Sequence, residues 1–237
     1  MITVLLPAGR AAAGDVVPLE PAEVHHLRVR RAGEALSVHL RDGRGFVGTG
    51  LLRDEGGRVA VVVEQAEMAA RPAPLRLAVA AADRDRFAWL VEKATELGVT
   101  DIFPIATERT AAVASRIREG QLARLRRRAF EAVKQCGTAW APDVHPAQSL
   151  ASLLAQRLEG ARWLADANGR AVPSTFGAGP STILVGPEGG LSRAEQDSAF
   201  AAGFLPVRLA EHVLRFETAA LAAAACAAAT RSGGANG

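Results

Sequence analysis

In the second part of this chain, short apolar strands alternate with helices, and this alternation limits the fold more than any other feature of the sequence. Runs 75–81 and 99–105 read as strands, and 85–97 between them carries apolar residues on one helical face. Gly98 follows this helix where a terminating glycine is expected. Strands and helices that alternate in this way form a mostly parallel sheet covered by helices, whose ligands bind at the carboxyl ends of the strands. The sequence therefore predicts an α/β domain over residues 75–237.

The first 70 residues are instead rich in short strands. Their apolar residues alternate with polar ones, and a turn such as Asp42-Gly43 is a hairpin signal. The expected strands lie at 2–5, 35–40, 46–53 and 58–67, with one short helix at 21–27. Short strands at this spacing favour a small β-barrel. Pro72 and Pro74 favour an extended path, so we expect a linker between a domain at 1–70 and the domain at 75–237.

Positive charge is concentrated in one stretch of the sequence. The whole chain carries a formal net charge of +3, whereas residues 109–134 hold eight Lys or Arg against Glu119 and Glu131, a net charge of +6. Such a run is either a solvated helix face or a stripe that contacts phosphates. Charge alone favours the solvated face.

The composition argues against several classes of protein. Two cysteines, without a metal-ligand motif, indicate neither a disulfide framework nor a metal site. The longest apolar stretch, 219–229, is too short and too rich in alanine to cross a bilayer. The first ten residues lack the basic and apolar regions of a secretion signal. We therefore expect a cytoplasmic protein that binds neither metal nor membrane.

Two strand-end loops near the C-terminus are the best candidates for a binding site. The apolar strand 183–185 runs into the loop Gly186-Pro187-Glu188-Gly189-Gly190. The strand 206–209 runs into 211–215, before an alanine-rich helix. Loops at the same edge of a parallel sheet can form one pocket. The three glycines permit positive φ angles and a close approach of a ligand to the backbone.

The residues of the first loop indicate what kind of ligand it holds. The loop lacks the Lys-Ser/Thr of a P-loop and the glycine spacing of a dinucleotide fingerprint. Glu188 would repel a phosphate, so a nucleoside without phosphates fits better. S-adenosylmethionine is such a ligand, and its sulfonium cation tolerates a carboxylate nearby. A plain tight turn is the alternative for this loop taken alone.

Three polar residues stand where the last helix begins. Glu217 interacts favourably with the helix dipole there, and Thr218 is either a capping residue or a ligand contact. Arg215 lies between Leu214 and Phe216, and this apolar setting makes it a candidate for binding an RNA phosphate or a ligand carboxylate.

Four segments of the chain resemble one family of enzymes. In chain order they are VEKATELGVTDIFPIATERT, FEAVKQCG, ILVGPEGGLS and LAEHVLRFETAAL. They resemble the RsmE-type 16S rRNA uridine-N3 methyltransferases of the SPOUT class, and HHLRVRRAGEALSVHLRDGRG looks like that family's small barrel. The resemblance implies an α/β fold with a trefoil-knotted, mostly parallel sheet and an N-terminal PUA-like β-barrel. It also implies a homodimer that uses S-adenosyl-L-methionine.

The resemblance implies particular site residues. The donor contacts that it implies are Gly186, Glu188, Gly189, Gly190, Leu209, Leu214, Arg215 and Thr218, and a loop around Asp166 is a candidate third contact. To methylate N3 of uracil, the enzyme must orient the methyl group, take the N3 proton and stabilise the uracil oxygens. We expect Arg215 to stabilise the oxygens. The candidate proton acceptors are Glu188, Glu217 and His212, of which Glu188 is our first choice.

In an rRNA enzyme, the basic stretch becomes a candidate contact with the RNA backbone. The residues that we expect to contact RNA are Arg28, Arg30, Arg31, Arg109, Arg124, Arg127, Arg128 and Lys134. The expected substrate is 16S rRNA or the small ribosomal subunit. Because N3 lies on the Watson–Crick edge, the target base must be unpaired or flipped out.

The chain departs from the family pattern at two positions. The family segment is usually LGxRILRxETA, whereas the usual Gly is here Ala210 and the usual first Arg is His212. Two alternatives therefore stay open. The first is an RNA-binding relative that has lost transfer activity, and the second is a SPOUT methyltransferase that acts on another RNA.

Overall fold

The computed structural model describes residues 2–7, 11–29, 36–56, 58–80, 83–110 and 119–233. The chain divides into two compact units. One comprises Met1–Arg71 and Phe130–Ala141, and the other comprises Pro72–Ala129 and Pro142–Gly237. The first unit thus takes in a short piece of the later sequence as well as the strand-rich N-terminal part.

The first unit is built on a five-stranded sheet in the order β1-β3-β4-β5-β2. Its elements are β1 (Ile2–Leu5), β2 (Val16–Pro18), α1 (Pro21–Val29), β3 (Ser37–Arg41), β4 (Phe46–Glu55) and β5 (Arg58–Met68). β1 pairs with β3 in parallel, and the other pairs are antiparallel. Alternate residues such as Val38 and Leu40 are buried in this unit's own core. The predicted strands and short helix are confirmed, while closure into a barrel stays a prediction.

The turn between β3 and β4 is fixed by one aspartate and one glycine. The Asp42 carboxylate accepts hydrogen bonds from the backbone N–H groups of Arg44 (2.6 Å) and Phe46 (2.9 Å). Gly43 adopts φ +64°, and a Cβ there would lie 2.6 Å from a ring carbon of Phe130. Glycine alone meets both conditions without strain, since other residues disfavour positive φ and a side chain would collide with this ring. The predicted turn is therefore confirmed, and a distant segment explains its glycine.

The second unit contains a parallel sheet in the order β12-β10-β11-β6-β7-β8, with β9 paired to β7. The strands are β6 (Leu75–Ala80), β7 (Asp101–Ala106), β8 (Asp143–Val144), β9 (Gln148–Ser149), β10 (Ala161–Ala171), β11 (Ser181–Val185) and β12 (Leu205–Arg208). Each of the pairs found among the described residues of this sheet is parallel. Every residue of β11 is buried, because this strand lies between β10 and β6 and is covered on both faces. The predicted mostly parallel sheet is confirmed.

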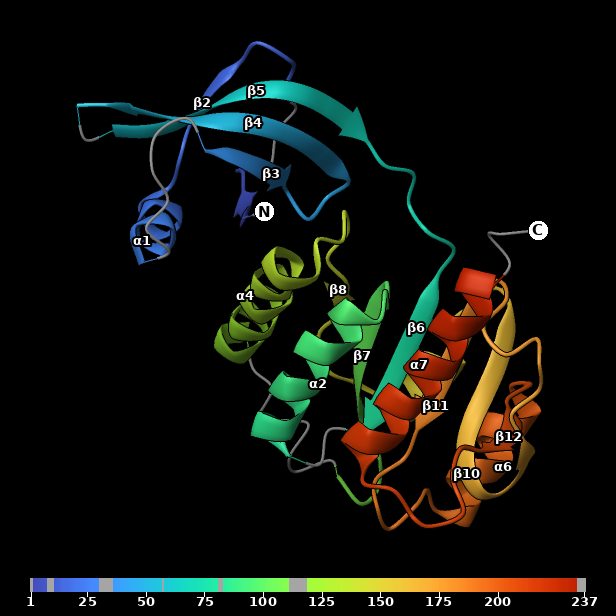
Figure 1. Ribbon diagram of the computed structural model, residues 1–237. Helices are drawn as coiled ribbons and strands as arrows, with labels where there is room; N and C mark the ends of the chain where they lie inside the picture. The colour runs from blue at the N-terminus through green and yellow to red at the C-terminus, as the bar shows by residue number, and fades with distance from the viewer. Residues whose placement is uncertain are drawn as a thin grey trace. The chain divides into compact units, whose positions relative to one another are not determined.

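Helices cover both faces of this sheet (Figure 1). The helices are α2 (Arg84–Glu96), α4 (Glu119–Cys136), α5 (Leu150–Leu154), α6 (Arg193–Ala201) and α7 (Phe216–Gly233). α2 and α7 share one hydrophobic core with β6 and β11, and α5 and α6 belong to a second core on the other face. The predicted terminating glycine is confirmed, because Gly98 follows α2 at φ +73°. At the start of α6, Ser192 forms a capping box with Glu195.

The alanines of α7 allow this helix to pack closely on the sheet. Ala220, Ala223, Ala224 and Ala227 are fully buried, and the helix contacts α2, β6 and β11. A Cβ at Gly177 would collide with Ala227, so the backbone approaches the helix directly. None of the helices in the described part of the chain is long and apolar enough to span a membrane.

Candidate active site

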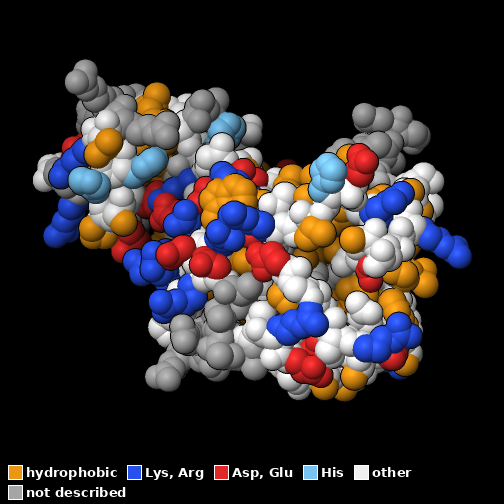
Figure 2. Space-filling model, turned by 90° about the horizontal axis from the view of Figure 1, so that it is seen from below, with side chains coloured by type: hydrophobic (Ala, Val, Ile, Leu, Met, Phe, Trp, Pro, Cys, Tyr) orange, Lys and Arg blue, Asp and Glu red, His pale blue; other side chains and the backbone are white. Residues whose placement is uncertain are grey.

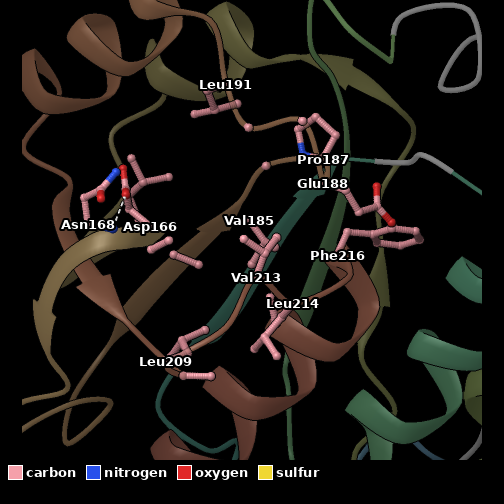
Figure 3. Close-up of a pocket in the computed structure, with 18 of the residues that line it drawn as sticks. Asp166, Asn168, Val185, Pro187, Glu188, Leu191, Leu209, Val213, Leu214 and Phe216 are labelled. Atoms are coloured by element: carbon pink, nitrogen blue, oxygen red, sulfur yellow. Dashed lines mark hydrogen bonds between the residues drawn. The ribbon is translucent and has the colours of Figure 1, made fainter.

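A pocket of about 280 Å³ lies where β11 and β12 end, beside the bend in β10 (Figure 3). Its volume is near the lower end of the range for small-molecule sites. Three segments of the chain form it, and the two predicted loops are among them. The lining residues are Leu164, Ala165, Asp166, Ala167, Asn168, Val185, Gly186, Pro187, Glu188, Gly189, Gly190, Leu191, Gln196, Leu209, Ala210, His212, Val213, Leu214, Phe216 and Ala219.

The first segment, the Gly-Pro-Glu-Gly-Gly loop, turns tightly on its own backbone. The N–H of Gly190 donates to the C=O of Pro187 (2.7 Å), and Gly190 adopts φ +72°. Of the three glycines that permit positive φ in this loop, Gly190 adopts it, whereas Gly186 and Gly189 do not. Space matters at the other two. A Cβ at Gly186 would lie 3.3 Å from Leu191, and one at Gly189 would lie 3.2 Å from a neighbouring guanidinium.

That guanidinium belongs to Arg109, in the turn that follows β7. Its Nη1 donates to the C=O of Gly190 at 3.3 Å. The adjacent Glu108 N–H donates to Oε1 of Glu195 (2.8 Å), and Oε2 of the same carboxylate accepts the N–H of Ser192 (2.9 Å). Arg109, which we expected to contact RNA, therefore forms a hydrogen bond with the backbone of the pocket loop.

The second segment continues from β12 into the first turn of α7. Leu209 and Leu214, two of the predicted donor contacts, line the pocket. Phe216 and Ala219 line it as well, since residues three apart share a face of a helix. The predicted contacts Arg215 and Thr218 are exposed and do not line the pocket, because each precedes a lining residue by one position and is rotated away. The structure therefore does not bring these two side chains to the pocket.

The third segment is an irregular stretch inside β10. The register of β10 against β12 shifts between Ala165 and Arg170. Within this shift the N–H of Asn168 donates to Oδ1 of Asp166 at 2.8 Å, and both residues line the pocket. The candidate third contact around Asp166 thus lies at the pocket. Its sequence signal was weak, because a strand irregularity has no motif of its own.

The ionisable side chains that line the pocket are Asp166, Glu188 and His212. No Lys or Arg is found among the described lining residues. In Figure 3, Asp166 lies on one side of Val185, and Glu188 lies on the other side, toward Phe216. Carboxylates on two sides of an arginine-free and lysine-free pocket favour a cation and disfavour phosphate. Ala210 and His212, the departures from the family pattern, both belong to this lining.

One cation stands just outside the lining, and sequence analysis missed it. Nη1 of Arg86, in the first turn of α2, lies 4.0 Å from Oε1 of Glu188, and its Nε lies 3.8 Å from Oε1 of Glu217. The Glu217 side chain is 9% exposed, and its Oε2 has no hydrogen-bond partner among the described residues. The packing of α2 beside α7 brings Arg86 to Glu217, which is far from it in the sequence. No sequence motif therefore marks Arg86.

Among the described residues that were predicted to contact RNA, some side chains are exposed and others are engaged in ion pairs. Arg28, Arg124 and Arg127 are exposed. Arg128 pairs with Glu92 through Nε (3.0 Å) and Nη2 (2.8 Å). Arg30 and Arg31 lie outside the described residues.

Lys134 is also engaged. It forms an ion pair with Glu23 in which both side chains are at least nine-tenths buried. This pairing disfavours an RNA contact at Lys134, which stays a prediction, because a buried ammonium is poorly placed to reach a phosphate. Among the described residues, no group of three or more His, Cys, Asp or Glu could hold a metal ion.

Comparison with known proteins places this fold and pocket in a family. The family model for the RNA methyltransferase domain matches residues 69–228. A ribosomal RNA small subunit methyltransferase E from Synechocystis sp. is 31% identical over 218 residues, which cover 86% of this chain and 69% of the relative. Its counterpart from Aquifex aeolicus is 28% identical over 212 residues, 87% of this chain and 91% of the relative. A crystal structure of the Neisseria gonorrhoeae ribosomal RNA small subunit methyltransferase E, bound to S-adenosyl methionine, matches with a TM-score of 0.81, 31% identity and 95% coverage of both chains.

The domain match puts this chain in the class of RNA methyltransferases. Given its identity to relatives over most of its length, the chain belongs to the family of ribosomal RNA small subunit methyltransferase E, the RsmE type. The predicted family is confirmed, and so is the SPOUT-type α/β fold with its small additional sheet. The knot stays a prediction.

Proposed function

We propose that this protein transfers a methyl group from S-adenosyl-L-methionine to N3 of a uridine in 16S rRNA of the small ribosomal subunit, in the cytoplasm. One observation carries the proposal: Asp166 and Glu188 line the pocket, and the described lining includes no Lys or Arg. Two arginines border this lining, but Arg86 faces Glu188 and Glu217 and Arg109 donates to the C=O of Gly190, so the lining itself favours a cation over a phosphate. S-adenosylmethionine is a nucleoside with a sulfonium cation and no phosphate, so it matches the pocket in chemical class.

The pocket backbone also suits a nucleoside. The Gly-Pro-Glu-Gly-Gly loop and the residues 209–215 lie outside helices and strands, so those of their N–H and C=O groups that are not already paired can bond to a ligand's polar edges. Val185, Leu214 and Phe216 offer apolar surface for an adenine. The relative from Neisseria gonorrhoeae, with the same fold, is bound to this compound. When bound, the donor supplies an electrophilic methyl group.

The acceptor base has to lose a proton before it can be methylated. A protonated N3 of uracil has no lone pair with which to attack, so a proton acceptor is required. Glu188 lines the pocket and is exposed, so its carboxylate can take this proton and release it to water. N3 becomes accessible only when the base is unpaired or flipped out of its stack.

We propose that Arg124 and Arg127 of α4 contact the RNA backbone, with Arg28 of α1 as a further contact. They are exposed, unlike Lys134, and Arg128 is already paired. Figure 2 shows Lys and Arg side chains interspersed with Asp and Glu on the face that it draws. An Arg124→Ala, Arg127→Ala double variant should reduce the slope of log affinity against log salt by about 2. An unchanged slope would mean that these arginines do not contact RNA phosphates.

We also propose that the protein is a homodimer that associates through α2 and α7. Trp89 on α2 is 44% exposed, an unusual state for so large an aromatic side chain. α7 packs beside α2 and presents exposed small residues such as Ala225 and Cys226. A Trp89→Glu variant should sediment as a monomer, and a Phe200→Glu variant on α6 should remain dimeric. A wild-type monomer in solution would contradict this proposal.

Two measurements test the enzymatic proposal. Nucleoside mass spectrometry of 16S rRNA from cells that lack the protein should show loss of N3-methyluridine, and retention of that nucleoside would refute the assignment. Calorimetry with S-adenosylmethionine should show binding. A protein that binds RNA but not this donor would be the inactive relative, with Ala210 and His212 as the first residues to exchange.

A further inference from the structure

Glu217 is a buried carboxylate whose position needs a reason. Its side chain is 9% exposed. In the part of the chain that the structure describes, its Oε2 has no hydrogen-bond partner, and its charged contact is Arg86, whose Nε lies 3.8 Å from Oε1. Burying a carboxylate with so little compensation is unfavourable. Such an arrangement is kept where the charge orients a functional group, and the group that Glu217 orients is the guanidinium of Arg86.

The guanidinium of Arg86 is only partly occupied by its two carboxylate neighbours. Its side chain is 42% exposed, and its contacts with Glu188 (4.0 Å) and Glu217 (3.8 Å) are longer than hydrogen bonds. A guanidinium carries five N–H donors in a rigid fork, so donors remain for a ligand. Glu188, whose Oε1 faces this guanidinium, also lines the pocket. A hydrogen-bond donor and an acceptor therefore stand side by side next to the pocket.

This pair is complementary to one nucleobase edge. Uracil presents an N–H donor at N3 between two carbonyl acceptors, whereas cytosine presents an amino donor beside an N3 acceptor. The guanidinium of Arg86 matches the O4 carbonyl of uracil, which cytosine replaces with an amino group, and the carboxylate of Glu188 matches N3–H. Cytosine would put a donor against Arg86 and an acceptor against Glu188, and both contacts would be repulsive.

We propose that Arg86, oriented by Glu217, binds the O4 carbonyl oxygen of the acceptor uracil beside Glu188 and so selects uracil over cytosine. The inference rests on the proposed function, and it gives Arg86 the role that the sequence suggested for Arg215. The N3–H bond breaks and its proton passes to Glu188. The electron pair left on N3 then forms the N–CH₃ bond as the S–CH₃ bond breaks and its electrons return to sulfur. Negative charge spread onto the carbonyl oxygen is stabilised by Arg86.

The test compares Arg86→Ala with Arg84→Ala, an exposed arginine in the same helical turn. Single-turnover methylation of small ribosomal subunits by Arg86→Ala should slow by about 100-fold, with donor affinity by calorimetry unchanged. Arg84→Ala should react at the wild-type rate. Glu217→Gln, which keeps the size of the side chain and removes its charge, should give a smaller loss.

The pH dependence separates charge stabilisation from a structural role. Without Arg86 the uracil is less acidic in the site, so the rate of Arg86→Ala should keep rising at alkaline pH values where the wild-type rate has levelled. A wild-type rate in Arg86→Ala would overturn the inference, and so would an equal loss at every pH together with lost donor binding. A wild-type protein that forms no N3-methyluridine would instead refute the proposed function.

Discussion

Replacing Lys134 with methionine should destabilise the first unit and leave RNA binding unchanged. The Lys134 side chain is 10% exposed and that of its partner Glu23 is 7% exposed. Removing one partner of a buried pair leaves an uncompensated charge and costs about 3–5 kcal/mol. Glu23 keeps a hydrogen bond from the N–H of Leu5 (3.2 Å), so we expect the lower end of this range, about 3 kcal/mol.

The effect can be measured by urea unfolding. With a typical slope of about 2 kcal/mol per M urea, a loss of about 3 kcal/mol moves the midpoint down by about 1.5 M. Trp140 belongs to the same unit as Glu23 and Lys134, and its Nε1 donates to the C=O of Ala69 at 3.3 Å. A background in which the other two tryptophans are phenylalanine makes its fluorescence a reporter of this unit.

Arg127→Met provides the matched control, because Arg127 lies on the same helix and is exposed. It should change stability by less than about 0.5 kcal/mol and reduce the salt slope of RNA binding by about 1. A Lys134→Met, Glu23→Gln double variant should recover part of the lost stability, since no unpaired charge remains buried. If Lys134→Met unfolded like the wild type, or weakened RNA binding as Arg127→Met does, the reasoning about this ion pair would be wrong.

Three further predictions concern the second unit. Gly190→Ala places an L-residue at φ +72° and should cost about 1–2 kcal/mol and weaken donor binding in calorimetry, whereas Gly120→Ala inside α4 should stabilise by about 0.5–1 kcal/mol in thermal unfolding. Burial raises the pKa of Asp101, but hydrogen bonds from His145 and a neighbouring threonine outweigh burial and hold this pKa below its ordinary value. The contribution of ionised Asp101 to the free energy of unfolding is therefore complete above the ordinary carboxyl pKa, and it is lost as the pH falls through the lower pKa of the folded state. Asp101→Asn removes this contribution, so it should flatten the acid side of a curve of stability against pH. Arg231 donates to four backbone carbonyl groups, and Arg231→Lys should lower the unfolding free energy by about 2–3 kcal/mol because an ammonium cannot replace the fork.

Much of the fold could be predicted because its signals are local. Apolar spacing predicted α2 as 85–97, and the helix runs over Arg84–Glu96. The alternation of strands and helices along the chain predicted the parallel sheet. The shortest elements, β2, β8, β9 and α5, were missed, since two to five residues carry too little periodicity to be seen.

The candidate site could be predicted in part for the same reason. The two loops were found because glycine-rich turns at strand ends are local patterns, and both line the pocket. Arg215 and Thr218 were expected at the donor because the family resemblance implies them, but helical rotation turns their side chains out of the lining. The bend at Asp166 was foreseen only as a candidate, because its geometry depends on the pairing of β10 with β12.

The sequence by itself determined the alternating architecture, the pocket loops and the family, since each depends on neighbouring residues or on order along the chain. Only the tertiary structure decided what each charged residue does. Lys134 is paired across the chain with Glu23, Arg109 braces Gly190, and Arg86 stands between two carboxylates. The partners lie far apart in sequence, and the energy of a charge depends on burial and on the nearest opposite charge. Neither quantity can be read from spacing, so the free arginines and the engaged ones were indistinguishable until the chain was folded.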